Sequence, residues 1–187
     1  MKMFSALALS AFLTVTAAAT PASAAVLDLT TGTNNGTTLT MPDATITAGA
    51  GTTLFVGDFI ANAVCPAGTF GCNGLMTLTF DFDVSNVTFD YGFANDGDSA
   101  VISGYDGLGN FVGNLLLNLT SGTGSASLAA LGVLRTIVFD TTASTGAGYA
   151  YGNINYDPAA VPLPAALPLL LVGLGGLGAL GLRRKKA

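Results

Sequence analysis

The sequence predicts an all-β fold, an antiparallel β-sandwich, with an apolar segment at each end of the chain. Between residues 25 and 160, apolar and polar residues alternate with a period of two, which is typical of half-buried strands. Clusters of Gly, Asn, Asp and Ser separate these short runs, and no stretch between them shows a long helical period. Many short strands at this spacing favour a jelly-roll or an immunoglobulin-like arrangement, with a signal helix before it and a transmembrane helix after it.

The N-terminal segment, residues 1–24, is typical of a secretory signal peptide. Lys2 supplies a positive charge, an apolar run follows, and small residues end the segment. We expect cleavage between Ala24 and Ala25 and export through the Sec system. The exported domain is then expected to span residues 25–160.

The clearest strand signal lies between residues 76 and 93. Apolar side chains alternate with Thr and Asp on both sides of Ser85 and Asn86, two residues that favour a turn. We therefore expect two antiparallel neighbours with an aromatic inner face and an acidic outer face. Further strands are expected at residues 99–105, 111–119, 135–140 and 149–156, and connections at 95–98, 106–110, 120–126 and 144–148.

The exported segment is strongly acidic. All eleven acidic residues of the chain are Asp and lie in it, against the single cation Arg135, which gives a formal charge of −10. Such a surface repels nucleic acid, so no nucleic-acid partner is expected. It can attract divalent cations or keep an exported domain soluble.

The exported segment offers little catalytic chemistry. The chain contains no His and no Glu, which excludes Ser–His–Asp and Cys–His catalysis. Asp81 and Asp83 are expected on one face of one strand, whereas glycoside hydrolysis uses two carboxylates that flank a cleft. We expect no enzymatic activity.

Three further carboxylates, on Asp96, Asp98 and Asp106, belong to turn-rich segments. Oxygen ligands of this kind suit calcium, but their spacing does not form an EF-hand loop, so turn-forming roles are favoured. No cofactor is expected, with calcium as the alternative. Cys65 and Cys72 are expected to form a structural disulfide, because the domain is exported and the pair is close in sequence.

The C-terminal segment reads "VPLPAALPLLLVGLGGLGALGLRRKKA", residues 161–187. Residues 166–182 form an apolar run for the membrane, and the basic tail of residues 183–187 stays in the cytoplasm. The cations of this tail are Arg183, Arg184, Lys185 and Lys186. A helix that begins at Pro168 and ends at Leu182 is only ~22 Å long at 1.5 Å per residue, which is short for a permanent anchor. The segment is either a retained anchor or a removable signal.

This stretch resembles the VPLPA-CTERM form of the PEP-CTERM sorting signals in its motif, its Gly/Leu-rich apolar segment and its basic end. Classical members have a glutamate at the position of Leu163. The resemblance implies recognition by an exosortase, a membrane-embedded processing enzyme of Gram-negative bacteria. It also implies cleavage near the motif and delivery from the inner membrane to the cell surface or the extracellular matrix. The motif residues are Val161, Pro162, Leu163, Pro164 and Ala165.

Together these features predict an exported, non-enzymatic surface or matrix protein, linked to exopolysaccharide or biofilm. Its partners would be the exosortase during export, the membrane before processing, and extracellular polysaccharide. The alternative is a carbohydrate-binding module, with or without calcium, which exposed aromatic side chains on one sheet face would favour. The candidates for such a face are Tyr105, Tyr149 and Tyr151.

Overall fold

The computed structural model describes residues 23–57, 60–68, 71–94, 98–119, 122–144 and 146–160. Within these ranges the chain forms β-strands and one short 3₁₀ helix, and every pair of named strands is antiparallel, which confirms the all-β prediction. The elements are β1 (Ala25–Val26), β2 (Thr33–Asn34), β3 (Thr38–Thr40), β4 (Ala44–Ala48), β5 (Thr53–Gly57), β6 (Ala63–Ala67), β7 (Leu75–Ala94), β8 (Asp98–Tyr105), β9 (Phe111–Leu119), β10 (Gly122–Ser127), η1 (Ala129–Leu131), β11 (Leu134–Asp140) and β12 (Ala150–Pro158).

No helix in the described ranges is long and apolar enough to cross a membrane. The expected signal helix and the expected C-terminal helix both lie outside these ranges. Residues 22–159 form a compact unit of their own, which contains all the core residues named below.

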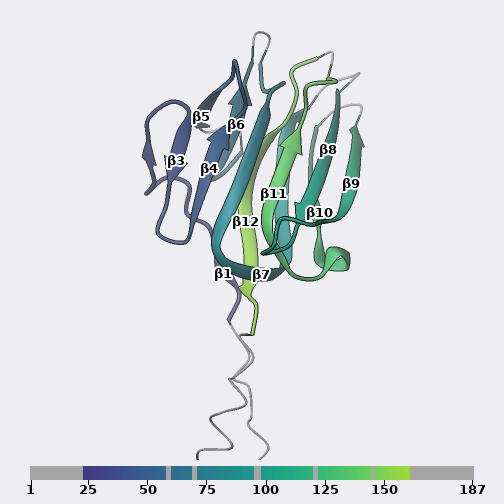
Figure 1. Ribbon diagram of the computed structural model, residues 1–187. Helices are drawn as coiled ribbons and strands as arrows, with labels where there is room; N and C mark the ends of the chain where they lie inside the picture. The colour runs from purple at the N-terminus through teal and green to yellow at the C-terminus, as the bar shows by residue number, and fades with distance from the viewer. Residues whose placement is uncertain are drawn as a thin grey trace, which may run out of the picture. The chain divides into compact units, whose positions relative to one another are not determined.

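The longest strand, β7, corrects the predicted hairpin. Residues 75–84 pair with β4 and β11, whereas residues 84–94 pair with β10 and β12. Along this fully described strand no pairing joins one half to the other, so the turn expected at Ser85 and Asn86 is wrong. Asn86 instead has a left-handed φ of 51°, which asparagine tolerates better than most residues. There β7 bends from one layer of the fold into the other (Figure 1).

The bend in β7 divides the strands into two layers. The first layer has the order β2-β3-β4-β7-β11-β8-β9, where β7 contributes its first half. The second has the order β5-β6-β12-β7-β10, where β7 contributes its second half, and β1 pairs with the far end of β12. One long strand thus belongs to both layers of a β-sandwich.

Aromatic side chains fill the space between the layers. The ring of Phe139, from β11 in the first layer, lies 5.4 Å from that of Phe89 and 4.5 Å from that of Tyr151, both in the second layer. Nearer the bend, Phe80 in the first layer lies 4.9 Å from Tyr156 in the second. All five side chains are almost completely buried. Large aromatic groups contribute much of the energy of such cores, so this cluster packs the two layers together.

A disulfide joins Cys65 of β6 to Cys72, with 5.2 Å between the Cα atoms, and confirms the predicted pair. The carbonyl of Cys72 accepts hydrogen bonds from the Thr141 hydroxyl at 3.0 Å and the Tyr149 amide at 3.2 Å. The bridge therefore connects β6 to the segments that follow β11 and precede β12.

Four predicted strands, at residues 99–105, 111–119, 135–140 and 149–156, correspond to β8, β9, β11 and β12 within two residues at either end. The connection expected at residues 120–126 is wrong in part, because β10 begins at Gly122. Its Gly, Thr, Ser and Ala residues resemble a loop in sequence, yet they pair with the second half of β7.

Candidate functional site

A shallow pocket lies on the outer face of the second layer. It has a volume of about 340 Å³, near the lower end of the ~300–1,000 Å³ range of small-molecule sites. Strands β7, β10 and β12 contribute residues to it, together with the segment before β6. The residues that line it are Ile60, Ala61, Asp90, Tyr91, Thr123, Gly124, Ser125 and Asn153.

The polar centre of the pocket is the carboxylate of Asp90. The Ser125 hydroxyl donates to its Oδ1 at 2.5 Å, and the Asn153 side-chain amide donates to its Oδ2 at 2.8 Å. These hydrogen bonds, first from Ser125 and then from Asn153, lower the pKa of Asp90 below its ordinary value of 3.8. The carboxylate is therefore fixed in orientation and remains charged at any pH near neutral.

Local irregularities of the backbone create this pocket. The register of β12 against β7 shifts between Gly152 and Asn155, and Asn153 in this bulge has a left-handed φ of 45°. The bulge re-aims one side chain of β12, as bulges commonly do, and places Asn153 beside Asp90. A Cβ atom at Gly152 would lie 2.7 Å from the Ala61 carbonyl oxygen, so glycine there lets the segment before β6 lie close against the sheet.

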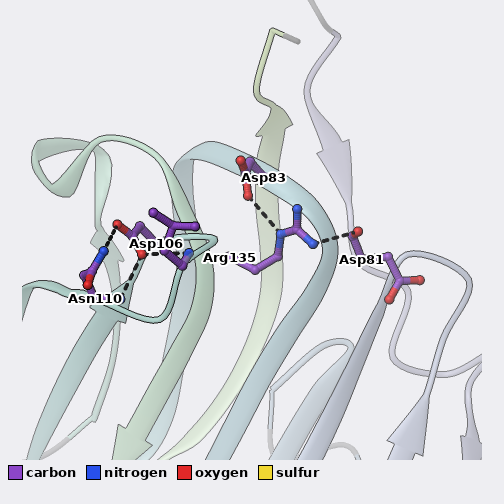
Figure 2. Close-up of polar contacts among 6 residues, drawn as sticks. Asp81, Asp83, Asp106, Asn110 and Arg135 are labelled. Carbon is purple, nitrogen blue, oxygen red and sulfur yellow. Dashed lines mark hydrogen bonds and ion pairs between the residues drawn. The ribbon is translucent and has the colours of Figure 1, made fainter.

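Asp81 and Asp83, the predicted carboxylate pair, both contact Arg135, Asp83 through its carboxylate and Asp81 through its main chain, as Figure 2 shows. The Arg135 Nε donates to Asp83 Oδ1 at 2.9 Å, and its Nη1 donates to the main-chain carbonyl of Asp81 at 3.0 Å. Neither aspartate lines the pocket. Arg135 and Asp83 form an ion pair near the bend of β7.

Of the three calcium candidates, Asp98 and Asp106 lie within the described residues and have different surroundings. Asp106 accepts the amide N–H groups of Leu108 at 2.9 Å and Asn110 at 2.8 Å, so its carboxylate closes the turn between β8 and β9 (Figure 2). Asp98 is buried and accepts hydrogen bonds from the Ser144 hydroxyl and the Gly146 amide. Asp96 lies outside the described residues. In the described part of the chain no group of three or more Asp or Cys side chains is placed to hold a metal ion.

The three tyrosines proposed for an exposed aromatic face do not lie together on one face. Tyr149 and Tyr151 are completely buried in the core between the layers, so their proposed place on a binding face is wrong. Their hydrophobic rings fill the sandwich rather than its surface. Tyr105 is half-buried on the first layer, where its ring packs edge-on against Phe111 at 5.8 Å.

The residues of the pocket were not predicted as a site. Alternation along β7 places Asp90 on an outer face, but Ser125 is 35 residues away in sequence and Asn153 is 63 residues away. Ser125 also lies in the segment expected to be a connection. Two predicted segments lie outside the described residues: the signal peptide up to residue 22, and the sorting motif with the basic tail that follows it. Ala24 and Ala25, at the expected cleavage site, lie within the described residues.

No protein-family model and no curated protein sequence matches the chain. Several solved structures match it at low similarity. One is the family 29 carbohydrate-binding module CBM29-2, with 16% identity, a TM-score of 0.44, and coverage of 73% of this chain and 86% of that one. Another is the module CtCBM11, with 13% identity, a TM-score of 0.35, and coverage of 77% and 99%. A third is an arabinose-bound α-L-arabinofuranosidase, with 12% identity, a TM-score of 0.39, and coverage of 72% and 26%. Scores this low assign neither the fold nor a function.

Proposed function

We propose that this chain is an exported, non-enzymatic surface protein whose β-sandwich binds carbohydrate in the pocket around Asp90. The observation that carries the proposal is the set of convergent polar groups at one concave site, Asp90, Ser125 and Asn153. A sugar presents hydroxyl groups that donate to carboxylates and accept from amides, and hydrogen bonds to a charged group are the stronger kind. The two protein hydrogen bonds fix Asp90 before a ligand arrives, which lowers the entropy lost on binding.

A binding role suits the pocket better than hydrolysis. Among the described residues that line it, Asp90 is the one carboxylate. Glycoside hydrolysis uses a pair of carboxyl groups about 5–10 Å apart, one of which commonly has a raised pKa. The pKa of Asp90 is instead lowered, so this group is a poor general acid.

The experiment is a calorimetric titration of the mature domain, residues 25–160, with exopolysaccharide purified from the producing bacterium, in the presence of calcium or of a chelator. We expect saturable binding under both conditions, because the described residues that line the pocket include a single carboxylate and form no cluster of metal ligands. Asp90→Asn keeps the shape of the side chain and removes its charge. It should weaken binding about tenfold, the equivalent of ~1.5 kcal/mol for a hydrogen bond to a charged group.

The matched control is Asp81→Asn, which removes an exposed carboxylate from the other layer. It should leave the affinity unchanged. Absence of saturable binding by the unmodified domain contradicts the proposal, and so does equal weakening by the two variants.

Delivery to the surface is the second part of the proposal and depends on residues 161–187. The domain supports it through the position of its two ends, because Ala25 of β1 pairs with Tyr156 of β12. The two ends of the described domain thus lie on neighbouring strands of the second layer. The test is the mass of the mature protein from cells with and without the exosortase. Retention of the C-terminal peptide in both contradicts processing.

A further inference from the structure

The outer face of the first layer carries a regular array of threonines. Strands β3, β4 and β7 each contain a Thr-x-Thr sequence, and the middle residue of each, Leu39, Ile46 or Leu78, is completely buried. Because successive side chains of a strand point to opposite faces, the six threonines point outward. β11 continues the array with Thr136 and Val138. We call these positions the threonine grid: Thr38, Thr40, Thr45, Thr47, Thr77, Thr79, Thr136 and Val138.

Strand pairing aligns the grid in two rows. Thr38 is opposite Thr47, which is opposite Thr77 and then Val138. The second row joins Thr40, Thr45, Thr79 and Thr136 in the same way. No register shift interrupts the pairing of β4 with either neighbour. Seven of the eight positions are threonine, and Val138 has the same branched shape, so the face presents one repeated group in two directions.

Among the described residues, the hydroxyl groups of the grid have no hydrogen-bond partner. Elsewhere threonine hydroxyls bond to the protein, as those of Thr30, Thr52 and Thr141 do at 2.6–2.7 Å. Within the part of the chain that the structure describes, no hydroxyl of the grid makes a hydrogen bond to the protein. All seven threonines are half-exposed or exposed, and no grid position carries a charge. Because the side chains are β-branched, rotation about χ1 is restricted, which limits the positions that each hydroxyl group can take.

The dimensions of the grid match those of ordered water. Opposite Cα atoms of antiparallel strands lie about 4.5–5.5 Å apart, and alternate residues of a strand lie about 6.7 Å apart. In a tetrahedral water lattice with O–H···O distances of ~2.75 Å, simple geometry places second neighbours ~4.5 Å apart and gives a perpendicular repeat of ~7.3 Å. The two repeats of the grid agree with these within about a fifth.

We propose that the threonine grid binds the surface of ice, with its hydroxyls as members of the ordered water layer and its methyl groups between them. Neighbouring strands twist by about 20–25°, so the match is best at the centre of the face. Thr45, Thr47, Thr77 and Thr79 of β4 and β7 occupy that centre. The grid contains no aromatic ring to stack on a sugar, which favours ice over a crystalline polysaccharide as its occupant.

The test measures thermal hysteresis and the shape of growing ice crystals with the mature domain, residues 25–160. Thr77→Lys places a long charged side chain at the centre of the grid. The matched control is Thr88→Lys, because Thr88 is half-exposed on the same strand but on the outer face of the other layer. We expect the unmodified domain and the control to shape ice, and Thr77→Lys to lose this activity while its circular dichroism spectrum and melting temperature are retained. Thr47→Ser, a milder change that removes only a methyl group, should weaken it.

Two results of the ice assay overturn the proposal. One is an unmodified domain that neither shapes ice nor shows hysteresis. The other is equal loss of activity in the Thr77 and Thr88 variants. If the unmodified domain instead binds particles of crystalline cellulose and only Thr77→Lys abolishes this, the face binds polysaccharide and the ice proposal is wrong. Sugar binding in the pocket is measured on the same samples, so failure of either proposal is visible without the other.

Discussion

The two halves of β7 present opposite kinds of outer surface. From Leu75 to Val84 its outward side chains join an array that continues without a register shift through β4 to β3. From Ser85 to Ala94 its partners β10 and β12 are both shifted in register, and a segment before β6 covers part of the face. Regular pairing produces a periodic surface, whereas bulges and close-packed glycines produce a pocket. The buried side chains of β7 change phase at the bend, from even-numbered positions before it to odd-numbered positions after it, and each half contributes to a different outer surface.

The largest expected effect comes from breaking the core that holds the halves together. Phe139→Ala removes the ring that contacts Phe89 and Tyr151 in the second layer. It should lower the free energy of unfolding by about 3–5 kcal/mol in urea denaturation, since the core then contains a cavity. Phe111→Ala is the control, because Phe111 is 59% exposed, and it should cost less than ~1 kcal/mol. Equal costs would show that Phe139 does not join the layers.

The next effect concerns only the second half of β7, where the pocket lies. Replacing Cys65 and Cys72 together by serine opens a short loop and should cost roughly 2–3 kcal/mol of stability in the chain-entropy model. Because the bridge lies in β6, directly after the segment that lines the pocket, sugar affinity should fall while ice shaping by the threonine grid is retained in the fraction that stays folded. Loss of both activities together in that fraction would contradict their independence.

A smaller effect is expected at the junction of the halves. The Tyr156 hydroxyl of β12 donates to Asp43 Oδ2 at 2.8 Å, in the connection between β3 and β4. Burial, reinforced by this hydrogen bond, raises the pKa of Tyr156 from 10.0 to about 12. A raised pKa means that its contribution to stability is fully present below pH 10 and is lost as the pH rises toward 12.

Tyr156→Phe removes this titration along with the hydrogen bond. We expect a cost of about 1.5 kcal/mol at neutral pH and a smaller loss of stability between pH 10 and 12 than in the unmodified domain. Urea denaturation across that range measures both. If the free energy of unfolding of the variant falls as steeply between pH 10 and 12 as that of the unmodified domain, Tyr156 does not cause the alkaline loss of stability.

The smallest effect is expected from the ion pair at the bend. The side chains of Arg135 and Asp83 are 35% and 45% exposed, and such pairs contribute about 0–1 kcal/mol because solvent screens them. Arg135→Gln should therefore lower stability by less than ~1 kcal/mol, and salt should reduce the difference further. A cost above ~3 kcal/mol, the size expected when a buried pair is broken, would show that the bend depends on this contact.

Alternation along the sequence was sufficient to predict the all-β fold and four strands near their observed bounds. It failed at Ser85 and Asn86 because the left-handed Asn86 bends the strand into the other layer, at a sequence that resembles a two-residue turn. It failed at residues 122–127 because small residues pair well at a sheet edge although they resemble a loop. Tyr149 and Tyr151 were misplaced because their residue type does not reveal which face of the strand becomes the core.

The two candidate surfaces differ in how far the sequence reveals them. Each Thr-x-Thr sequence is visible by itself, but only strand pairing aligns residues 38–40, 45–47 and 77–79. The pocket leaves less trace, because Asp90, Ser125 and Asn153 come together only through a bulge and through a strand that looks like a connection. The local sequence pattern predicts which face of a strand a residue occupies. Strand register and bulges decide which of these residues come together in a site.

The claim that the two halves of β7 support separate surfaces is tested most directly by one binding measurement. Exopolysaccharide is titrated into the unmodified domain, Asp90→Asn and Thr77→Lys. We predict saturable binding that Asp90→Asn weakens about tenfold and Thr77→Lys leaves unchanged. No saturable binding by the unmodified domain, or equal weakening by both variants, would contradict the account.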